Sequence, residues 1–175
     1  MKMIVTLFVV FAFASSAFGF TCPVPETTPG ADIGKIAGQW YVIRGIIISS
    51  TTNSTMTFTP REDVDFEIKW PGSTSTGEKY VAYGRRTDNQ NLLNIYFNVS
   101  KDAPIILSFN VVATDYDNYL AAYVCWLGEN EFLFDKLILS RSNTLNADKV
   151  AELDALLTDK VGNFLDQLFK KTKYY

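Results

Sequence analysis

Short segments that alternate between apolar and polar side chains run from residue 38 to residue 145, and this two-residue period limits the fold more than any other feature. Clusters of Gly, Pro, Asn, Asp and Ser separate the segments, as turns separate strands. The pattern predicts eight strands, over residues 39–48, 55–59, 63–70, 79–87, 92–100, 105–114, 119–126 and 132–142. Because every connection is short, we expect consecutive strands to be antiparallel neighbours.

Each predicted strand has one apolar and one polar face. In the segment 63–70 the even-numbered residues are Val64, Phe66, Ile68 and Trp70, and the odd-numbered residues are all charged. Eight such strands can close into an antiparallel up-and-down β-barrel, which leaves no unpaired edge and encloses a lumen. A sandwich of two sheets shows the same alternation, so the period alone leaves that architecture open. We predict the all-β class with the barrel as its architecture.

The period changes after Asn146. Apolar residues then recur at helical spacing, at Val150, Leu153, Leu156, Leu157, Val161, Phe164, Leu165 and Leu168. Asn146 is a suitable N-cap, and we expect Gly162 to break the helix into two pieces. The apolar stripe predicts a C-terminal α-helix packed on the outside of the barrel. The alternative is a helix that binds a membrane or a partner, which Lys170, Lys171 and Lys173 would favour.

Residues 1–19 have the pattern of a secretory signal peptide. Lys2 precedes an apolar run over 4–14, and Ala17 and Gly19 are the small residues that a signal peptidase recognises. A membrane anchor would need roughly 18 to 20 apolar residues. We therefore expect cleavage after Gly19, a single domain over residues 20–175, secretion to the extracellular space, and no stable membrane insertion.

In a secreted protein, the two cysteines and the two glycosylation motifs predict covalent modifications. An even pair of cysteines in a secreted chain indicates a disulfide, here between Cys22 and Cys125. The sequons at Asn53 and Asn98 lie on the polar parity of their strands, so both are predicted glycosylation sites.

The sequence contains no histidine, and this excludes several chemistries. A Ser-His-Asp or Cys-His catalytic unit, a His-ligated zinc and a haem held by a proximal histidine all need an imidazole. Two cysteines are also too few for a Cys-only zinc site, so we expect no metal. The formal net charge of −3 argues against a nucleic-acid partner, whose binding depends on clustered Lys and Arg.

Three stretches in order resemble the signature motifs of the lipocalin family. They are Gly-Gln-Trp-Tyr at 38–41, Thr-Asp-Tyr at 114–116 followed by Asn-Tyr at 118–119, and Leu-Ser-Arg-Ser at 139–142. The segments 109–115 and 118–125 are most similar to the group of insect bilin-binding proteins, insecticyanins and apolipoprotein D-like proteins. The resemblance covers nearly all of the chain after residue 20.

The resemblance implies a structural base, a disulfide and a ligand class. The base would be formed by Gly38, Trp40, Asp115 and Arg141, with the indole of Trp40 closing the barrel floor and the guanidinium of Arg141 packed across it. In the family group an N-terminal cysteine pairs with one on the seventh strand, as Cys22 and Cys125 would here. The ligand would be a small hydrophobic molecule of the bilin, fatty acid, sterol, retinoid or pheromone class.

Strand parity gives the residues expected to line the lumen and bind the ligand. They are Val42, Arg44, Ile46, Phe58, Phe66, Ile68, Trp70, Ala82, Ile95, Phe97, Phe109, Val111, Ala122, Val124, Trp126, Asp135 and Leu137. Small residues at positions expected to face inward favour a cavity, namely Ala82, Gly84, Ala113 and Ala122. Ordinary core filling by the aromatic residues is the alternative.

Arg44 and Asp135 form the most specific hypothesis from parity. The first and last strands are neighbours in a closed barrel, so an inward Arg44 and an inward Asp135 would lie close together. A charge in an apolar lumen needs a partner, and such a pair could anchor a carboxylate, carbonyl or hydroxyl of a ligand. Alternatively, a bulge near Gly45 turns Arg44 outward, or Asp135 lies at the solvated rim.

The resulting functional prediction is a secreted carrier of a small hydrophobic ligand. It needs no cofactor, although a bilin or lipid could be bound, and we expect a monomer or weak homo-oligomer. An enzyme of the prostaglandin-isomerising kind would need a free thiol in the lumen, and both cysteines are assigned to the disulfide, so no catalysis is expected. The alternative function is a storage, defence or interaction protein with a filled core.

Overall fold

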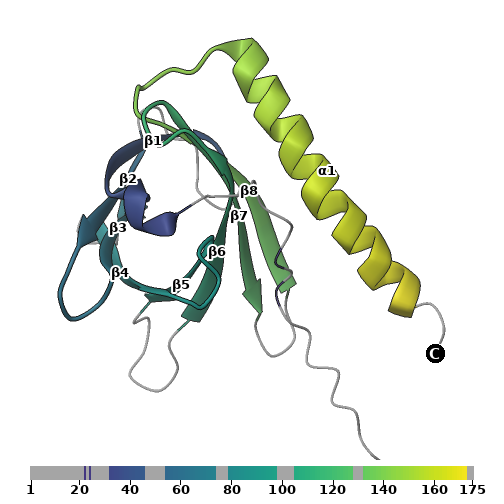
Figure 1. The fold of residues 1–175 in the computed structure, drawn as a ribbon, viewed down its shortest axis with the longest axis horizontal. Helices are drawn as coiled ribbons and strands as arrows, with labels where there is room; N and C mark the ends of the chain where they lie inside the picture. Colours follow the sequence, from purple (N-terminus) through teal and green to yellow (C-terminus); the bar gives the residue numbers. More distant parts are fainter. Residues whose placement is uncertain are drawn as a thin grey trace, which may run out of the picture.

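The computed structural model describes residues 22, 24, 32–45, 54–73, 79–97, 105–127 and 132–172. Within these ranges eight antiparallel strands form one closed barrel in consecutive order, with the last strand paired to the first (Figure 1). The strands are β1 (Gly38–Arg44), β2 (Thr55–Pro60), β3 (Phe66–Ser73), β4 (Lys79–Arg86), β5 (Leu92–Phe97), β6 (Ile105–Thr114), β7 (Tyr119–Leu127) and β8 (Phe132–Ser140). The barrel prediction is confirmed, and the β1–β8 ladder excludes the open sandwich.

The third strand begins later than the alternation predicted. Residues 63–65 belong to the turn between β2 and β3, where the Arg61 N–H donates to the Asp65 carbonyl (3.4 Å). The Asp65 carboxylate also accepts the backbone N–H of Arg86 at 2.7 Å. Alternation continues through this turn, so the pattern alone could not mark where pairing starts.

The apolar residues form two separate clusters, one inside the barrel and one outside. The inner cluster takes the inward-facing residues of all eight strands and the 3₁₀-helix η1 (Ile33–Ile36). The outer cluster lies between β6, β7, β8 and the C-terminal helix, and its buried members are Val112, Ala113, Ala121, Tyr123, Cys125, Ile138, Leu153, Leu157 and Val161. Alternation along one strand therefore supplies both cores, one on each face.

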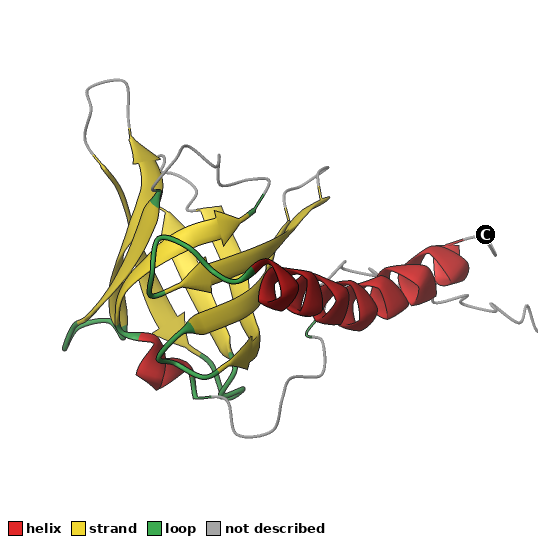
Figure 2. Cartoon of the chain, turned by 90° about the horizontal axis from the view of Figure 1, so that it is seen from above, coloured by secondary structure: helices red, strands yellow, loops and turns green. Residues whose placement is uncertain are grey.

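The helix α1 (Ala147–Thr172) runs without interruption through Gly162, so the predicted break is wrong. Glycine lowers helix propensity by about 1 kcal/mol without forcing the chain out of the helix. Asn146 is the N-cap, because its Oδ1 accepts the N–H groups of Asp148 (2.8 Å) and Lys149 (3.3 Å). The first half of α1 packs on the barrel exterior as predicted, and the second half projects beyond the barrel (Figures 1 and 2).

The disulfide between Cys22 and Cys125 is present, which confirms the predicted pairing. Their Cα atoms are 5.8 Å apart and 103 positions separate them in the chain. The predicted signal peptide 1–19, the sequons at Asn53 and Asn98, and the lumen candidate Ile46 lie outside the described residues. None of the helices within the described ranges is long and apolar enough to span a membrane.

Candidate functional site

One end of the barrel is closed by η1, which packs into the interior before β1 begins (Figure 1). Asp32 caps this short helix, because its Oδ1 accepts the Gly34 N–H at 2.8 Å. Trp40 then ties β1 to the helix, with its indole N–H donating to the Ile36 carbonyl at 2.8 Å. Trp40 and Ile36 are fully buried, so this end of the barrel is a floor.

Arg141 clamps the floor at the point where the chain leaves β8. Its guanidinium carbon lies 3.6 Å from the centroid of the Trp40 ring, a close cation–π contact. It also donates three hydrogen bonds to backbone carbonyls, those of Ala37 (2.8 Å), Gln39 (2.9 Å) and Tyr116 (3.0 Å). Burial lowers the pKa of Arg141 and the negative charge of Asp117 opposes that shift. The role of Arg141 is to join three backbone segments.

Gly38 is required by this clamp for two reasons. Its φ of +99° lies in a region that residues with a side chain rarely adopt. A Cβ at this position would also lie only 3.0 Å from Nη1 of Arg141. The glycine of the first motif thus lets the backbone pass directly beneath the guanidinium.

Asp115 holds the turn between β6 and β7 that carries Tyr116. Its carboxylate accepts the N–H groups of Asn118 (2.8 Å) and Tyr119 (3.0 Å) and the side-chain amide of Asn118 (2.9 Å). Desolvation acts to raise the pKa of Asp115, but these hydrogen bonds outweigh it and the pKa is lowered. The turn places Tyr116 at a φ of 66°, where its carbonyl reaches Arg141 and its hydroxyl accepts the Asp32 N–H.

Tyr116 is therefore part of the floor, although the sequence analysis did not select it. Its ring packs against the inner cluster, and the ammonium of Lys35 lies 5.6 Å from the ring centroid. The available signal was its place inside the second motif, directly after Asp115. Its partners come from segments far apart in the chain, so the sequence pattern could not show them.

The lower half of the barrel, next to the floor, is filled by side chains. Phe58 from β2 and Phe109 from β6 meet with ring centroids 5.7 Å apart, although these strands lie on opposite sides of the barrel. Phe66 packs against Phe58 at 5.9 Å. A Cβ on Gly84 would lie 2.8 Å from a methyl carbon of Leu93, so Gly84 makes room for Leu93. The expectation that Gly84 enlarges a cavity is wrong.

The packing loosens toward the opposite end, which we call the mouth, where β3, β5 and β7 end. Trp70, Phe97 and Trp126 form a mouth-side aromatic group at this end. Trp70 and Phe97 meet edge to face with centroids 5.1 Å apart, and Phe97 and Trp126 are only partly buried. Leu133, which pairs with Trp126 across β7 and β8, is 43 % exposed. Phe97, Trp126 and Leu133 are therefore less buried than Phe58 and Phe109 in the lower half.

The structure brings most of the predicted lumen residues together. Those on the inner face are Val42, Phe58, Phe66, Ile68, Trp70, Ala82, Ile95, Phe97, Phe109, Val111, Ala122, Val124, Trp126 and Leu137 in the inner cluster, with Asp135 between them. Further members that the prediction omitted are Met56, Leu93, Leu107, Leu120 and Leu139, all on the same parity.

Arg44 does not face the lumen, and its predicted pairing with Asp135 is wrong. The β1–β8 register shifts between Val42 and Arg44, so Arg44 pairs with the outward-facing Ile138. Its side chain is 53 % exposed and lies 3.3 Å from a carboxylate oxygen of Asp154 on α1. A bulge of this kind was the alternative considered from the sequence.

A second register shift corrects the position of Ala113. In the β6–β7 ladder, Val111 pairs with the inward Ala122, but Ala113 pairs with the outward Ala121. Ala113 therefore belongs to the outer cluster beneath α1 and contributes nothing to a cavity.

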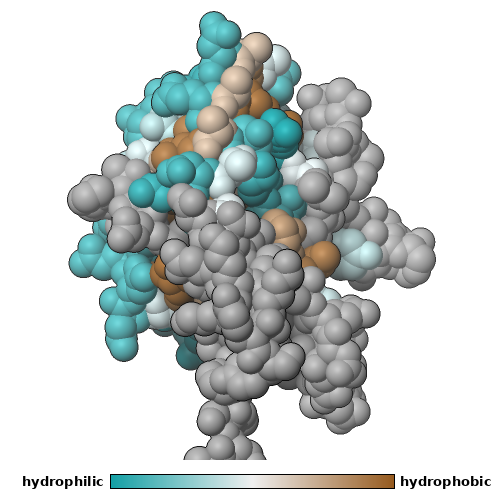
Figure 3. Space-filling model, turned by 90° about the vertical axis from the view of Figure 1, so that its right-hand side faces the viewer, coloured by the Kyte–Doolittle hydropathy of each residue, from teal (hydrophilic) through white to brown (hydrophobic). Residues whose placement is uncertain are grey.

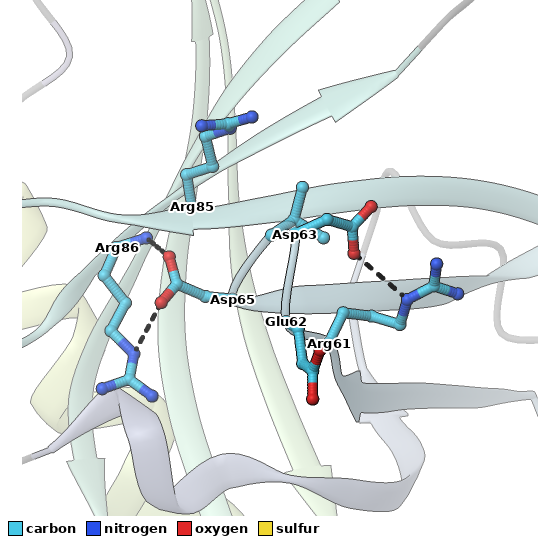
Figure 4. A pocket seen from close by; sticks show the side chains of 7 residues that line it. Arg61, Glu62, Asp63, Asp65, Arg85 and Arg86 are labelled. Atoms are coloured by element: carbon cyan, nitrogen blue, oxygen red, sulfur yellow. Dashed lines mark hydrogen bonds and ion pairs between the residues drawn. The ribbon is translucent and has the colours of Figure 1, made fainter.

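A shallow charged depression of about 270 Å³ lies outside the barrel, at the β2–β3 turn and the end of β4 (Figure 4). It is lined by Arg61, Glu62, Asp63, Val64, Asp65, Arg85 and Arg86. Arg61 pairs with Asp63 and Arg86 with Asp65, each at 3.3 Å, while Arg85 points away from both pairs. A depression with this lining offers little apolar surface to a hydrophobic ligand.

Where Figure 3 colours the exterior on the side of α1, most of the described residues are hydrophilic and apolar side chains lie among them. Within the described ranges no group of three or more His, Cys, Asp or Glu side chains could hold a metal ion. The barrel interior at its mouth is therefore the best candidate site.

Comparison with known proteins shows what the chain is similar to in sequence and in fold. No protein-family model matches it. Apolipoprotein D of Cavia porcellus is 28 % identical over 154 residues, which cover 81 % of this chain and 78 % of the relative.

Two solved structures share the fold. Lipocalin 12 from rat epididymis matches with a TM-score of 0.64 and 13 % identity over 81 % of this chain and 87 % of its own. An LTBP1 mutant in complex with leukotriene C4 matches with a TM-score of 0.53 and 18 % identity over 74 % and 84 %. The closed barrel, the contact of Arg141 with Trp40 at its floor and the similarity to apolipoprotein D agree with the resemblance to the lipocalin family that the sequence motifs indicate.

Proposed function

We propose that the protein binds and carries a small hydrophobic molecule in the mouth-side half of its barrel. The observation that supports this is the contrast between the filled lower half and the partly exposed aromatic group of Trp70, Phe97 and Trp126. Apolar walls supply most of the affinity for such a ligand, at about 25 cal/mol per Å² buried. A solved protein of the same fold, LTBP1, holds leukotriene C4.

The ligand belongs to the bilin, fatty acid, sterol, retinoid or pheromone class in this proposal, and the protein is exported. A disulfide is stable in oxidising compartments, so the Cys22–Cys125 bridge supports secretion after cleavage behind Gly19. Glycans at Asn53 and Asn98 would be consistent with that route. We assign a carrier rather than an enzyme, because the chain has no histidine and the disulfide engages both of its thiols.

The filled lower half also favours a second candidate function. If the side chains that meet across the barrel, such as Phe58 and Phe109, continue to occlude the interior up to the mouth, the protein acts through its surface as a storage, defence or interaction protein. The carrier and the filled-core protein differ in whether the interior accepts a guest.

The test compares two neighbouring residues on β6 that face opposite sides. Leu107 points inward and is 8 % exposed, whereas Ile106 points outward and is 44 % exposed. A neutral fluorescent probe, N-phenyl-1-naphthylamine, is titrated into the wild type and into the Leu107→Gln and Ile106→Gln variants. Burying an amide against the ligand without a partner costs about 1–3 kcal/mol, so Leu107→Gln weakens binding roughly 5- to 150-fold.

The Ile106→Gln variant should bind as the wild type does, and urea unfolding checks that both variants are folded. Extraction of the native protein and mass spectrometry should release an apolar molecule. If the wild type takes up no probe and releases no such molecule, the carrier function is rejected in favour of the filled core.

A further inference from the structure

Arg86 is the last residue of β4, and it stands at the floor end of that strand. It shares its parity with Ala82, which faces the interior, and in the β4–β5 ladder it pairs with the fully buried Leu93. Its side chain is nevertheless 49 % exposed. Arg86 therefore follows the inner face of the barrel down to the edge of the floor and reaches the surface there.

The guanidinium of Arg86 lies against η1. An added Cβ on Gly34 would lie 2.9 Å from Nη2 and 3.0 Å from both Nη1 and Cζ, so only a residue as small as glycine permits this approach. The same guanidinium lies 5.9 Å from the ring centroid of Phe66, which is 1 % exposed. Arg86 thus bridges η1 and the first residue of β3.

Asp65 fixes Arg86 in this position. Its carboxylate accepts the backbone N–H of Arg86 at 2.7 Å and lies 3.3 Å from Nε of the same residue (Figure 4). The two side chains are 36 % and 49 % exposed. An ion pair in contact with water contributes little and is screened by salt, so this attachment of η1 is a weak one.

The floor holds η1 through further contacts of a different kind. The Ile33 N–H donates to the Gln90 carbonyl at 3.0 Å, which joins η1 to the turn between β4 and β5. The indole N–H of Trp40 donates to the Ile36 carbonyl at 2.8 Å, and Trp40 is fully buried. These are hydrogen bonds to backbone carbonyls, whereas the contact through Arg86 depends on two opposite charges.

We propose that Arg86 and Asp65 form a salt-sensitive floor latch, whose release lets η1 open locally while the barrel stays folded. Opening separates η1 from β1 and breaks the hydrogen bond between the Trp40 indole and the Ile36 carbonyl. A segment held by few contacts opens at a lower free energy than the whole protein unfolds. Opening at the floor is independent of whether the interior takes a ligand.

Hydrogen exchange of the Trp40 indole N–H, followed by NMR, measures this opening, and the indole of Trp70 at the mouth is the internal reference. Arg86→Met keeps a long side chain and removes the guanidinium. Exchange at Trp40 should become about 3- to 30-fold faster, the combined range of an exposed ion pair and a cation–π contact. The matched control is Arg61→Met, which removes the same charge from the same depression and points away from Arg86 (Figure 4). It should leave exchange at Trp40 within about twofold.

Salt tests the latch in the wild type, where no variant has to fold. Raising sodium chloride from about 0.05 M to about 1 M should speed exchange at Trp40 relative to Trp70, and this effect should be lost in Arg86→Met. Urea unfolding gives the free energy of global unfolding for comparison.

Three results would refute the latch. The first is a Trp40 indole that exchanges only through global unfolding in the wild type. The second is an equal change of exchange in Arg86→Met and Arg61→Met, which would indicate an effect of net charge. The third is exchange that salt does not alter, which would exclude the ion pair as the element that holds η1. The carrier function stands in all three cases, because none of these measurements involves a ligand.

Discussion

The same substitution at two glycines should change stability in opposite directions. Gly38 has a φ of +99° and lies beneath Arg141, whereas Gly162 lies within α1 and an added Cβ there would meet no atom within 4 Å. Gly38→Ala and Gly162→Ala each add one methyl group. Comparing the two variants therefore separates the effect of the local backbone conformation from the effect of adding a methyl group.

The magnitude for Gly38→Ala has two parts. Placing a residue with a Cβ in a left-handed conformation costs roughly 1–2 kcal/mol. The new Cβ would lie 3.0 Å from Nη1 of Arg141, so the guanidinium must move and its 2.9 Å hydrogen bond to the Gln39 carbonyl weakens. The loss of one such hydrogen bond costs about 1 kcal/mol or slightly more. We expect a total destabilisation of about 2–3 kcal/mol.

Gly162→Ala should stabilise the protein by about 0.5–1 kcal/mol, because alanine loses less backbone entropy in a helix and meets no obstruction here. Urea unfolding followed by circular dichroism, with the disulfide intact, measures both variants. A Gly38→Ala variant within about 0.5 kcal/mol of the wild type would refute the account of the floor, and a destabilised Gly162→Ala variant would refute the continuous helix.

A double-mutant cycle divides the Gly38 effect into its two parts. Arg141→Met removes the guanidinium that the added Cβ approaches, so Gly38→Ala in that background should retain only the conformational cost. We expect a coupling of about 1 kcal/mol between the two positions. No coupling would mean that the close approach is harmless and that backbone conformation alone requires glycine.

Three further predictions concern other parts of the barrel. Burial raises the pKa of the Tyr123 phenol, whose hydroxyl has no hydrogen-bond partner among the described residues. The free energy of unfolding of the wild type should therefore fall as the pH rises above about 10, where the phenol ionises in the unfolded chain. The Tyr123→Phe variant should lose less stability above pH 10 and should be at least as stable as the wild type at pH 7. Urea unfolding across pH 7–11 measures both. For Asp115, whose pKa is lowered in the folded protein, stability changes with pH in the opposite direction. The stabilising contribution of its carboxylate exists near neutral pH and is lost as the pH falls below about 4. Asp115→Asn should consequently differ from the wild type more at pH 7 than at pH 2.5, and equal differences at both would contradict the hydrogen-bonded turn. Replacing Cys22 and Cys125 together by serine should lower the free energy of unfolding by about 2–5 kcal/mol, and an unchanged urea midpoint would show that the bridge adds no stability.

The sequence by itself determined the eight strands and their order, the disulfide pair and most of the inner face, whereas the β1–β8 ladder decided that the barrel is closed. A strand places successive side chains on opposite sides through local backbone geometry, so parity assigned Phe66, Trp70 and Leu137 to the interior without any knowledge of their neighbours. The N-cap at Asn146 is equally local, because its oxygen reaches N–H groups two and three residues ahead.

The tertiary structure decided where parity breaks. One extra residue in β1 turned Arg44 to the exterior, and one in β6 turned Ala113 toward α1. A strand inside the barrel pairs with a neighbour on each side, and a bulge adjusts its pairing register with one of them. The sequence of that strand alone does not state the registers of both pairings. Arg44 also forms its ion pair with Asp154 on α1, a residue more than a hundred positions away in the chain.

Contacts across the barrel were likewise beyond the reach of the pattern. Phe58 and Phe109 fill the lower half because closure brings opposite strands within reach, and Tyr116 joins the floor because its turn meets Asp32 and Arg141 in space. Alternation states which way a side chain points. Closure of the barrel decides how far the side chain on the opposite strand reaches. Only then is it determined whether the interior is filled or open at a given depth.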